Sequence, residues 1–116
     1  MDNDNENVFD INKNVEYCDD YQPTEAEVKA RIFKEITENM LSIYNRKNKD
    51  YGDAFSESFR EFGPTSAVIR IGDKYRRFKN LVLKQYDPEV EESIVDTLID
   101  MANYAIMTVI ELERSF

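Results

Sequence analysis

The segment 87–116 constrains the fold most, because it is apolar almost all round and yet carries a row of acids. Asp87 and Pro88 form a helix start, with an N-cap residue followed by a proline at the first helical position. Between residues 97 and 110 the only charged side chain is Asp100. A helix that is apolar nearly all round is typical of a protein interior, so we expect neighbours on several of its sides.

Two further segments show the three-four apolar spacing of amphipathic helices. Thr24 and Glu27 form a capping box, which predicts a helix from there to near Asn48. Pro64 begins the second segment, which we expect to end near Val82. The apolar stripe of this second helix consists of Val68, Ile71, Tyr75, Phe78 and Val82. Between the two long helices we expect a short one whose aromatic side chains lie in the core, or alternatively stack on a base: Phe55, Phe59 and Phe62.

Two glycines interrupt these patterns. The four residues that end at Gly52 are the expected break after the first long helix, because glycine tolerates backbone angles that other residues avoid. Lys47, Lys49 and Tyr51 beside it could close over a phosphate or a base, although a charged helix end capped by a loop is the commoner explanation. Gly72 lies inside the second helix, where it costs about 1 kcal/mol relative to alanine. We expect either a ligand or a crossing helix to approach the backbone there.

The expected fold is therefore all-α, a small bundle of three long helices and a short one. A chain of 116 residues has room for one domain, which we place at residues 23–116. Residues 1–22 are expected to form an acidic tail or a docking arm, since the first twenty hold seven acids and one lysine. Because a small domain buries a modest share of its surface, we expect homo-oligomerisation, as a dimer or tetramer, to complete the bundle.

Composition excludes several functions. A net charge of −9 argues against a duplex nucleic-acid partner, which requires a basic surface. The chain has no histidine, so any chemistry must depend on carboxylates, Lys, Arg, Tyr or a bound metal. No uninterrupted apolar run approaches the ~20 residues that cross a bilayer, so no membrane partner is expected. An acidic beginning without an export signal and a single cysteine, Cys18, indicate a cytoplasmic protein.

Two sets of polar residues could carry chemistry. The row on the C-terminal helix lies along one face, since its members are four, four and three residues apart: Glu92, Asp96, Asp100 and Asn103. The second long helix offers a mixed set beside its apolar stripe: Arg70, Asp73, Lys74 and Arg77. One interpretation is an ion-pair network between the two helices. The other is a site in which the acids bind Mg²⁺ and the basic residues grip phosphates.

The order of these blocks resembles a known family. Residues 47–55 (KNKDYGDAF), then Arg70, Asp73-Lys74 and Arg77, then Glu92-Ser93 with Asp96-Thr97-Leu98, Asp100 and Ala102-Asn103-Tyr104-Ala105 resemble the nucleotide modification associated domain 1 family, found largely in phages and their hosts. The resemblance covers roughly residues 25–110. A phage origin would place the protein in the host cytoplasm.

That family is in turn similar to the all-α nucleoside triphosphate pyrophosphatases of the MazG and dimeric dUTPase type. The resemblance implies an oligomeric bundle in which acids from two helices hold Mg²⁺. Asp96 fits the Glu-x-x-Asp pattern of one helix, but Ser93 stands where that pattern has an acid. The other helix should supply Glu-Glu-x-x-Glu, and here it offers only Asp73.

We therefore expect a nucleotide-binding protein, with Mg²⁺-dependent pyrophosphatase-like activity on a nucleotide or modified nucleotide as the first hypothesis. Asp96 and Asp100 are the candidate catalytic residues. The candidate metal ligands are Asp73, Glu92, Asp96 and Asp100, and the candidate ligand-binding residues are Arg70, Lys74, Arg77, Asn103, Lys49 and Tyr51. The alternatives are a non-catalytic sponge that sequesters a nucleotide-derived immune signal, and an accessory subunit of nucleotide modification.

Overall fold

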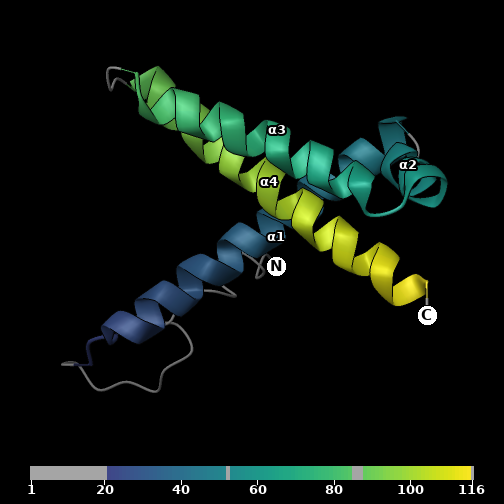
Figure 1. Cartoon of the computed structure of the whole chain (residues 1–116). Helices are drawn as coiled ribbons and strands as arrows, with labels where there is room; N and C mark the ends of the chain where they lie inside the picture. Colours follow the sequence, from purple (N-terminus) through teal and green to yellow (C-terminus); the bar gives the residue numbers. More distant parts are fainter. Residues whose placement is uncertain (1–20, 52, 85–87, 116) are drawn as a thin grey trace. The chain divides into compact units, whose positions relative to one another are not determined.

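The all-α prediction is confirmed by the computed structural model, which describes residues 21–51, 53–84 and 88–115, apart from the side chains of Asp50 and Tyr51. These residues contain four helices and no strand (Figure 1). The helices are α1 (Glu25–Tyr51), α2 (Ala54–Phe62), α3 (Thr65–Val82) and α4 (Pro88–Arg114). The chain divides into two compact units between Ile43 and Tyr44, inside α1. The predicted N-terminal tail lies almost entirely outside the described residues and stays a prediction.

The predicted capping box begins α1 and shapes the first unit. The backbone N–H of Glu27 donates to Thr24 Oγ1 at 3.1 Å, and the backbone N–H of Thr24 donates to Glu27 Oε1 at 2.9 Å. Tyr21 adds a third bond, because its hydroxyl donates to Glu27 Oε1 at 2.8 Å. The two bonds from backbone N–H groups satisfy donors that a helix start leaves without partners, so local residues determine where α1 begins.

The end of α1 differs from the prediction. The helix continues to Tyr51, three residues beyond the expected end at Asn48. Lysine, aspartate and tyrosine all tolerate helical geometry, so nothing before Gly52 forces the helix to stop. The extra turn matters because α1 residues from Tyr44 onward belong to the second unit, which holds the candidate site.

The second unit is organised around α3 and α4, which lie side by side and run in opposite directions (Figure 1). α2 packs against both of them. The ring centroid of Phe55 in α2 lies 5.6 Å from that of Tyr104 in α4. The small core of this unit is formed by side chains that are at least nine-tenths buried: Phe59, Ala67, Leu81 and Ile94. The short helix carrying the phenylalanines is therefore confirmed, although Phe62 is 63% exposed and does not join the core.

The apolar stripe predicted for α3 is only half right. Val68, Tyr75 and Val82 are exposed, while Ile71 and Phe78 are partly covered. The covered face also includes the buried Ala67 and Leu81, and it recurs at intervals of four, three, four and three residues: Ala67, Ile71, Lys74, Phe78 and Leu81. The true register thus places a lysine in the row that faces α4.

A glycine turn joins α2 to α3. Gly63 has φ of +70° and ψ of −160°, a backbone conformation that residues with a Cβ rarely adopt. Its carbonyl accepts hydrogen bonds from the backbone N–H of Ser66 at 3.1 Å and from the Ser66 hydroxyl at 2.8 Å. Pro64 is the N-cap of α3, one position before the place predicted for it. The Gly-Pro pair therefore sets the angle at which α3 leaves α2.

The expectation that the C-terminal helix is enclosed is wrong for the second unit taken by itself. Only Ile94 and Thr97 of α4 are buried, and Val95, Ile106 and Val109 are about half exposed. The reason is that α3 and α2 cover only one side of the helix. By length and composition alone α4 could also cross a membrane, a property that core helices of soluble proteins share. The absence of a membrane partner and the homo-oligomer stay predictions.

Candidate functional site

Two lysines converge on Asp100 at the middle of α4. Lys74 Nζ donates to Asp100 Oδ2 at 3.0 Å, and Lys47 Nζ lies 3.4 Å from Oδ1. The side chains of Lys74 and Asp100 are 29% and 28% exposed, whereas that of Lys47 is 59% exposed. The ion-pair interpretation is therefore confirmed for Lys74 and Asp100. The cluster carries two positive charges for one negative charge.

Helix geometry explains why these three groups meet. Lys74 occupies the row of α3 that faces α4, and Asp100 lies beside the covered face of α4. Lys47 follows Tyr44 by three residues, so both side chains share one face of the last turns of α1. Tyr44 is partly covered, and this marks the face of α1 that is turned toward the cluster. Each group is thus held by a different helix.

A cavity of about 80 Å³ opens at this cluster. Its lining consists of Tyr44, Lys47, Lys74, Asp100, Asn103, Tyr104 and Met107. The predicted residues Lys74, Asp100 and Asn103 are therefore brought together. The volume is below the ~300 Å³ at which pockets for whole small molecules begin. In one chain the cavity accommodates a group such as a phosphate rather than an entire nucleotide.

Arg77 is positioned one turn farther along α3. Its Nε donates to Thr97 Oγ1 at 3.2 Å, and the Thr97 hydroxyl donates to the Ser93 carbonyl at 2.7 Å. Thr97 is only 2% exposed, whereas Arg77 is exposed. The buried hydroxyl therefore fixes one edge of the guanidinium while the side chain remains accessible to a ligand.

Arg70 lies at a different cavity. This groove of about 490 Å³ between α2 and α3 is lined by Ser58, Phe62, Thr65, Ser66, Ile69 and Arg70. Arg70 and Lys74 are one turn apart on α3, but they line separate cavities. The predicted trio of Arg70, Lys74 and Arg77 thus shares a helix without sharing a cavity.

The predicted metal ligands do not gather in the described part of one chain. Asp73 Oδ1 accepts from Arg76 NH2 at 3.0 Å, and both oxygens of Asp100 face lysines. Glu92 and Asp96 are exposed on α4. Among the described residues no three acids or cysteines form a group that could hold a metal ion. The four predicted ligands therefore do not form one cluster within a single chain, and the magnesium site stays a prediction.

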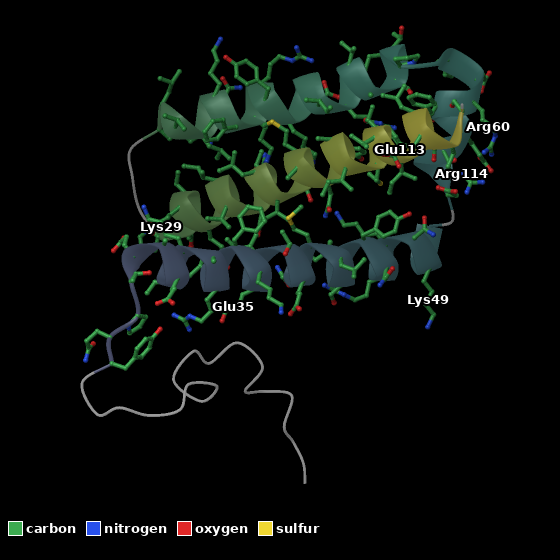
Figure 2. All side chains as sticks on the ribbon, turned by 90° about the horizontal axis from the view of Figure 1, so that it is seen from below. Lys29, Glu35, Lys49, Arg60, Glu113 and Arg114 are labelled. Carbon is green, nitrogen blue, oxygen red and sulfur yellow. The ribbon has the colours of Figure 1, made fainter. Side chains whose placement is uncertain are left out.

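Lys49 and Tyr51 are the candidate residues that were predicted at the end of α1. Figure 2 shows the Lys49 side chain pointing away from the ribbon, and Tyr51 falls outside the described side chains. Lys47, two residues earlier, is the lysine that reaches the site. The signal that identifies Lys47 is its three-residue spacing from Tyr44, which places it on the covered face of α1.

A second polar network, which was not predicted from the sequence, joins α2 to α4. The buried Ser56 hydroxyl donates to Glu111 Oε2 at 2.7 Å, and Arg60 NH1 donates to Ser56 Oγ at 3.3 Å. Ser56 lies on the same face as Phe59, three residues on. The sequence signal for this network is a serine in the apolar row of a short helix.

Comparisons with known proteins give one match. A family model described as nucleotide modification associated domain 1 matches residues 47–112, more than half of the chain. The matched segment begins at Lys47 and contains every residue that lines the small cavity except Tyr44. Comparison with curated proteins and with solved structures found no match.

Proposed function

This chain belongs to the nucleotide modification associated domain 1 family, and we propose that it acts in nucleotide modification by binding a nucleotide through its phosphate, held by Lys47 and Lys74. The observation that carries this proposal is the pairing of two ammonium groups with one carboxylate at a cavity. The cluster has an excess of one positive charge, so an anion entering the cavity meets a favourable local field despite the acidic chain.

The size of the cavity limits which part of a nucleotide it takes. A volume of about 80 Å³ suits a phosphate group, and the sugar and base then lie at the opening. Asn103 offers an amide that both donates and accepts hydrogen bonds, as recognition of a sugar or base edge requires. Tyr44 and Tyr104 add aromatic surface on the same cavity. We propose that a second phosphate contacts Arg77, whose Nε donates to Thr97 Oγ1 one turn farther along α3.

Binding without turnover is the version that the geometry favours. Phosphate cleavage on the pyrophosphatase plan needs Mg²⁺ to activate water and neutralise charge. That plan requires several carboxylates at one point, and in one chain Asp100 is engaged by lysines while Asp96 stands exposed. The hydrolytic version therefore needs ligands from another copy of the chain. A sponge or an accessory binding subunit needs only the lysines, Arg77 and Asn103.

The test uses purified full-length protein with a panel of nucleoside mono-, di- and triphosphates and modified or cyclic nucleotides, with and without Mg²⁺. Ligand in solution and ligand released by heat are identified by mass spectrometry. Recovery of an intact nucleotide, with binding lost in Lys47→Met and Lys74→Met, supports the proposal. The matched control is Lys79→Met, which removes an exposed lysine from the same helix outside the cavity.

Asp100 distinguishes the two versions. An Asp100→Asn variant keeps both lysines, so a binding protein retains its ligand, whereas a metal-dependent hydrolase loses a ligand of its metal. If the native chain converts a nucleotide to shorter products, and Asp100→Asn and Asp96→Asn abolish this conversion, hydrolysis replaces binding as the proposed function. Absence of any bound or converted nucleotide would leave the cluster as an ion pair alone and overturn the proposal.

A further inference from the structure

The groove between α2 and α3 is a second cavity, to which the proposed function assigns no ligand. We name it the α2–α3 groove and define it by the described residues that line it: Ser58, Phe62, Thr65, Ser66, Ile69 and Arg70. Its volume is about 490 Å³, against about 80 Å³ at the lysine cluster. Pockets for whole small molecules begin at ~300 Å³, so the α2–α3 groove has room for such a molecule.

Local residues shape this groove. Ser58 and Phe62 are one turn apart on α2, and the four lining residues of α3 also repeat after one turn, so each set lies on one side of its helix. Gly63, with φ of +70°, turns the chain between the two sets, and Figure 1 shows α2 beside the first turns of α3. The Ser66 hydroxyl, on a residue that is 8% exposed, donates to the Gly63 carbonyl at 2.8 Å. The groove is therefore held open by the turn itself.

Phe62 gives the groove an aromatic surface that the fold does not use. Its side chain is 63% exposed and makes no ring contact with any described residue. By contrast, the ring centroid of Phe55 lies 6.2 Å from that of Phe59 and 5.6 Å from that of Tyr104. Ile69, on the α3 side of the groove, is 54% exposed. An exposed phenylalanine is a surface on which a planar ring can stack.

Arg70 gives the same groove a positive charge that no described acid neutralises. Among the described lining residues it is the charged one, and it makes no ion pair with any side chain that the structure describes. Arg76, on the same helix, instead pairs with Asp73 at 3.0 Å. A guanidinium without an acid partner binds a phosphate or a carboxylate through its parallel N–H groups. The α2–α3 groove therefore suits an anion that also carries a planar apolar ring.

We propose that the α2–α3 groove is a second nucleotide-binding site, in which the base stacks on Phe62 and the phosphate binds Arg70. Ser58 and Thr65 supply hydroxyl groups that donate and accept hydrogen bonds, as the edges of a base and a sugar require. The family match favours a nucleotide over other aromatic anions, because the matched residues 47–112 include the whole groove. The groove and the lysine cluster share no described lining residue, so the two sites are separate.

The same chemistry of base and phosphate occurs in free nucleotides and in single-stranded nucleic acid. Proteins that bind single strands combine a positively charged groove along the backbone with aromatic platforms for successive bases. The α2–α3 groove offers one arginine and one phenylalanine, and the chain carries a net charge of −9, which repels a polyanion. The occupant is therefore a free nucleotide.

The experiment uses a full-length Lys74→Met chain, in which the lysine cluster is disabled and the groove is intact. One cation faces the phosphate in the groove where two do so at the cluster, so the groove fills at higher ligand concentration. Equilibrium dialysis up to millimolar concentration compares a nucleoside monophosphate with ribose 5-phosphate, which lacks the base, and with the nucleoside, which lacks the phosphate. We expect the nucleoside monophosphate to bind more tightly than either of its parts.

Two further substitutions in this chain separate the roles of ring and charge. Phe62→Leu should weaken binding of the nucleoside monophosphate about tenfold and leave that of ribose 5-phosphate unchanged. Arg70→Met should also weaken the nucleoside monophosphate about tenfold, but leave the nucleoside unchanged. The matched controls are Phe33→Leu, at a phenylalanine that is 70% exposed, and Arg76→Met on α3, since neither residue lines the groove. Neither control should change any of the three affinities.

Three results would overturn the proposal: no nucleotide bound by the Lys74→Met chain, hexyl phosphate bound as tightly as the nucleotide, or a single-stranded oligonucleotide bound far more tightly than the nucleotide. The second would show that the groove accepts any apolar anion, and the third that it holds nucleic acid. Should Phe62→Leu lose its helical signal in far-UV circular dichroism, Ile69→Ala takes its place and must still reduce the advantage of the nucleotide over ribose 5-phosphate.

Failure of the groove and failure of the lysine cluster are distinguishable in the native chain. If the lysine cluster binds no nucleotide, Lys74→Met leaves nucleotide binding unchanged while Phe62→Leu and Arg70→Met weaken it. If the groove binds none, Lys74→Met abolishes binding while the two groove variants leave it unchanged.

Discussion

Lys74 Nζ lies 3.0 Å from Asp100 Oδ2, and Lys74 stands in the very row of α3 that otherwise packs apolar side chains against α4. A lysine in a core-facing row needs an anionic partner or a path to solvent. Here it has both, because Asp100 accepts its hydrogen bond and about three-tenths of the side chain remains exposed. The pair is thus both a packing element and the centre of the candidate site.

Replacing Lys74 with methionine separates these two roles. Asp100 keeps Lys47 as a partner, and the pair is partly exposed, so we expect the free energy of unfolding to change by less than about 1 kcal/mol. Nucleotide affinity should fall about tenfold or more, since a charge-assisted hydrogen bond to phosphate is lost. Urea unfolding and isothermal titration calorimetry measure the two quantities. A large loss of stability with unchanged affinity would assign Lys74 to the fold alone.

The buried hydroxyl of Thr97 gives a second prediction. Thr97→Val keeps the shape of the side chain but removes the acceptor of the Arg77 Nε bond, so we expect a loss of about 1 kcal/mol in urea unfolding. The control is Thr108→Val, because the Thr108 hydroxyl also donates to a carbonyl of α4 at 2.7 Å, that of Tyr104. A larger loss for Thr97→Val than for Thr108→Val is expected from the bond to Arg77 together with the deeper burial of Thr97. Equal losses would show that Arg77 gains nothing from Thr97.

Local signals predicted much of the fold. The capping box at Thr24 and Glu27 and the proline at residue 88 fix the starts of α1 and α4, because each depends only on neighbouring residues. The register of α3 was harder to predict. Val68, Tyr75 and Val82 are as apolar as the covered residues, and only packing against α4 decides which row is inside.

The candidate site was predictable only in part, for the same reason. Asp100 and Lys74 follow from polar residues placed on apolar helices, and an ion pair between these two helices is one of the two interpretations that the sequence supports. The sequence does not distinguish Lys47 from Lys49, because only packing against the other helices shows which face of α1 is covered. Arg70 and Lys74 line separate cavities because of where α2 packs. The spacing of residues along α3 does not predict that packing.

The cap of α1 predicts a response to pH. Backbone N–H donation at Thr24, followed by the Tyr21 hydroxyl, lowers the pKa of Glu27 below its usual value of about 4.5. A lowered folded-state pKa means that the cap stabilises the helix start above pH ~4.5 and loses this effect as pH falls through the folded value. We expect amide exchange at Thr24 and Glu27 to accelerate in that range. Glu27→Gln should remove the pH dependence, and a profile unchanged by this variant would contradict the assignment.

The cap of α1 also predicts a response at alkaline pH, where stability is lost as pH rises and not as it falls. Hydrogen bonding to Glu27 raises the pKa of Tyr21 above its usual value of 10.0. A raised folded-state pKa means that this contribution is present below pH ~10 and is lost as pH rises through the folded value. Tyr21→Phe should therefore abolish any alkaline loosening of the α1 start while leaving the acid response in place. Ultraviolet titration of the tyrosines, compared between the two proteins, measures this directly.

Gly72 lies inside α3, and its surroundings decide the sign of a substitution there. A Cβ added at this position would have as its three nearest neighbours only atoms of the Arg76 guanidinium, the closest at 3.2 Å. Arg76 is 65% exposed at its side chain and can shift by a few tenths of an ångström. Gly72→Ala should therefore stabilise the chain by about 0.5–1 kcal/mol through helix propensity. Thermal unfolding at low protein concentration measures the gain, with Ser58→Ala as a comparison on α2. A loss of stability that grows with protein concentration would instead show that a second chain approaches the backbone at Gly72, and the outer face of α3 would then be an interface.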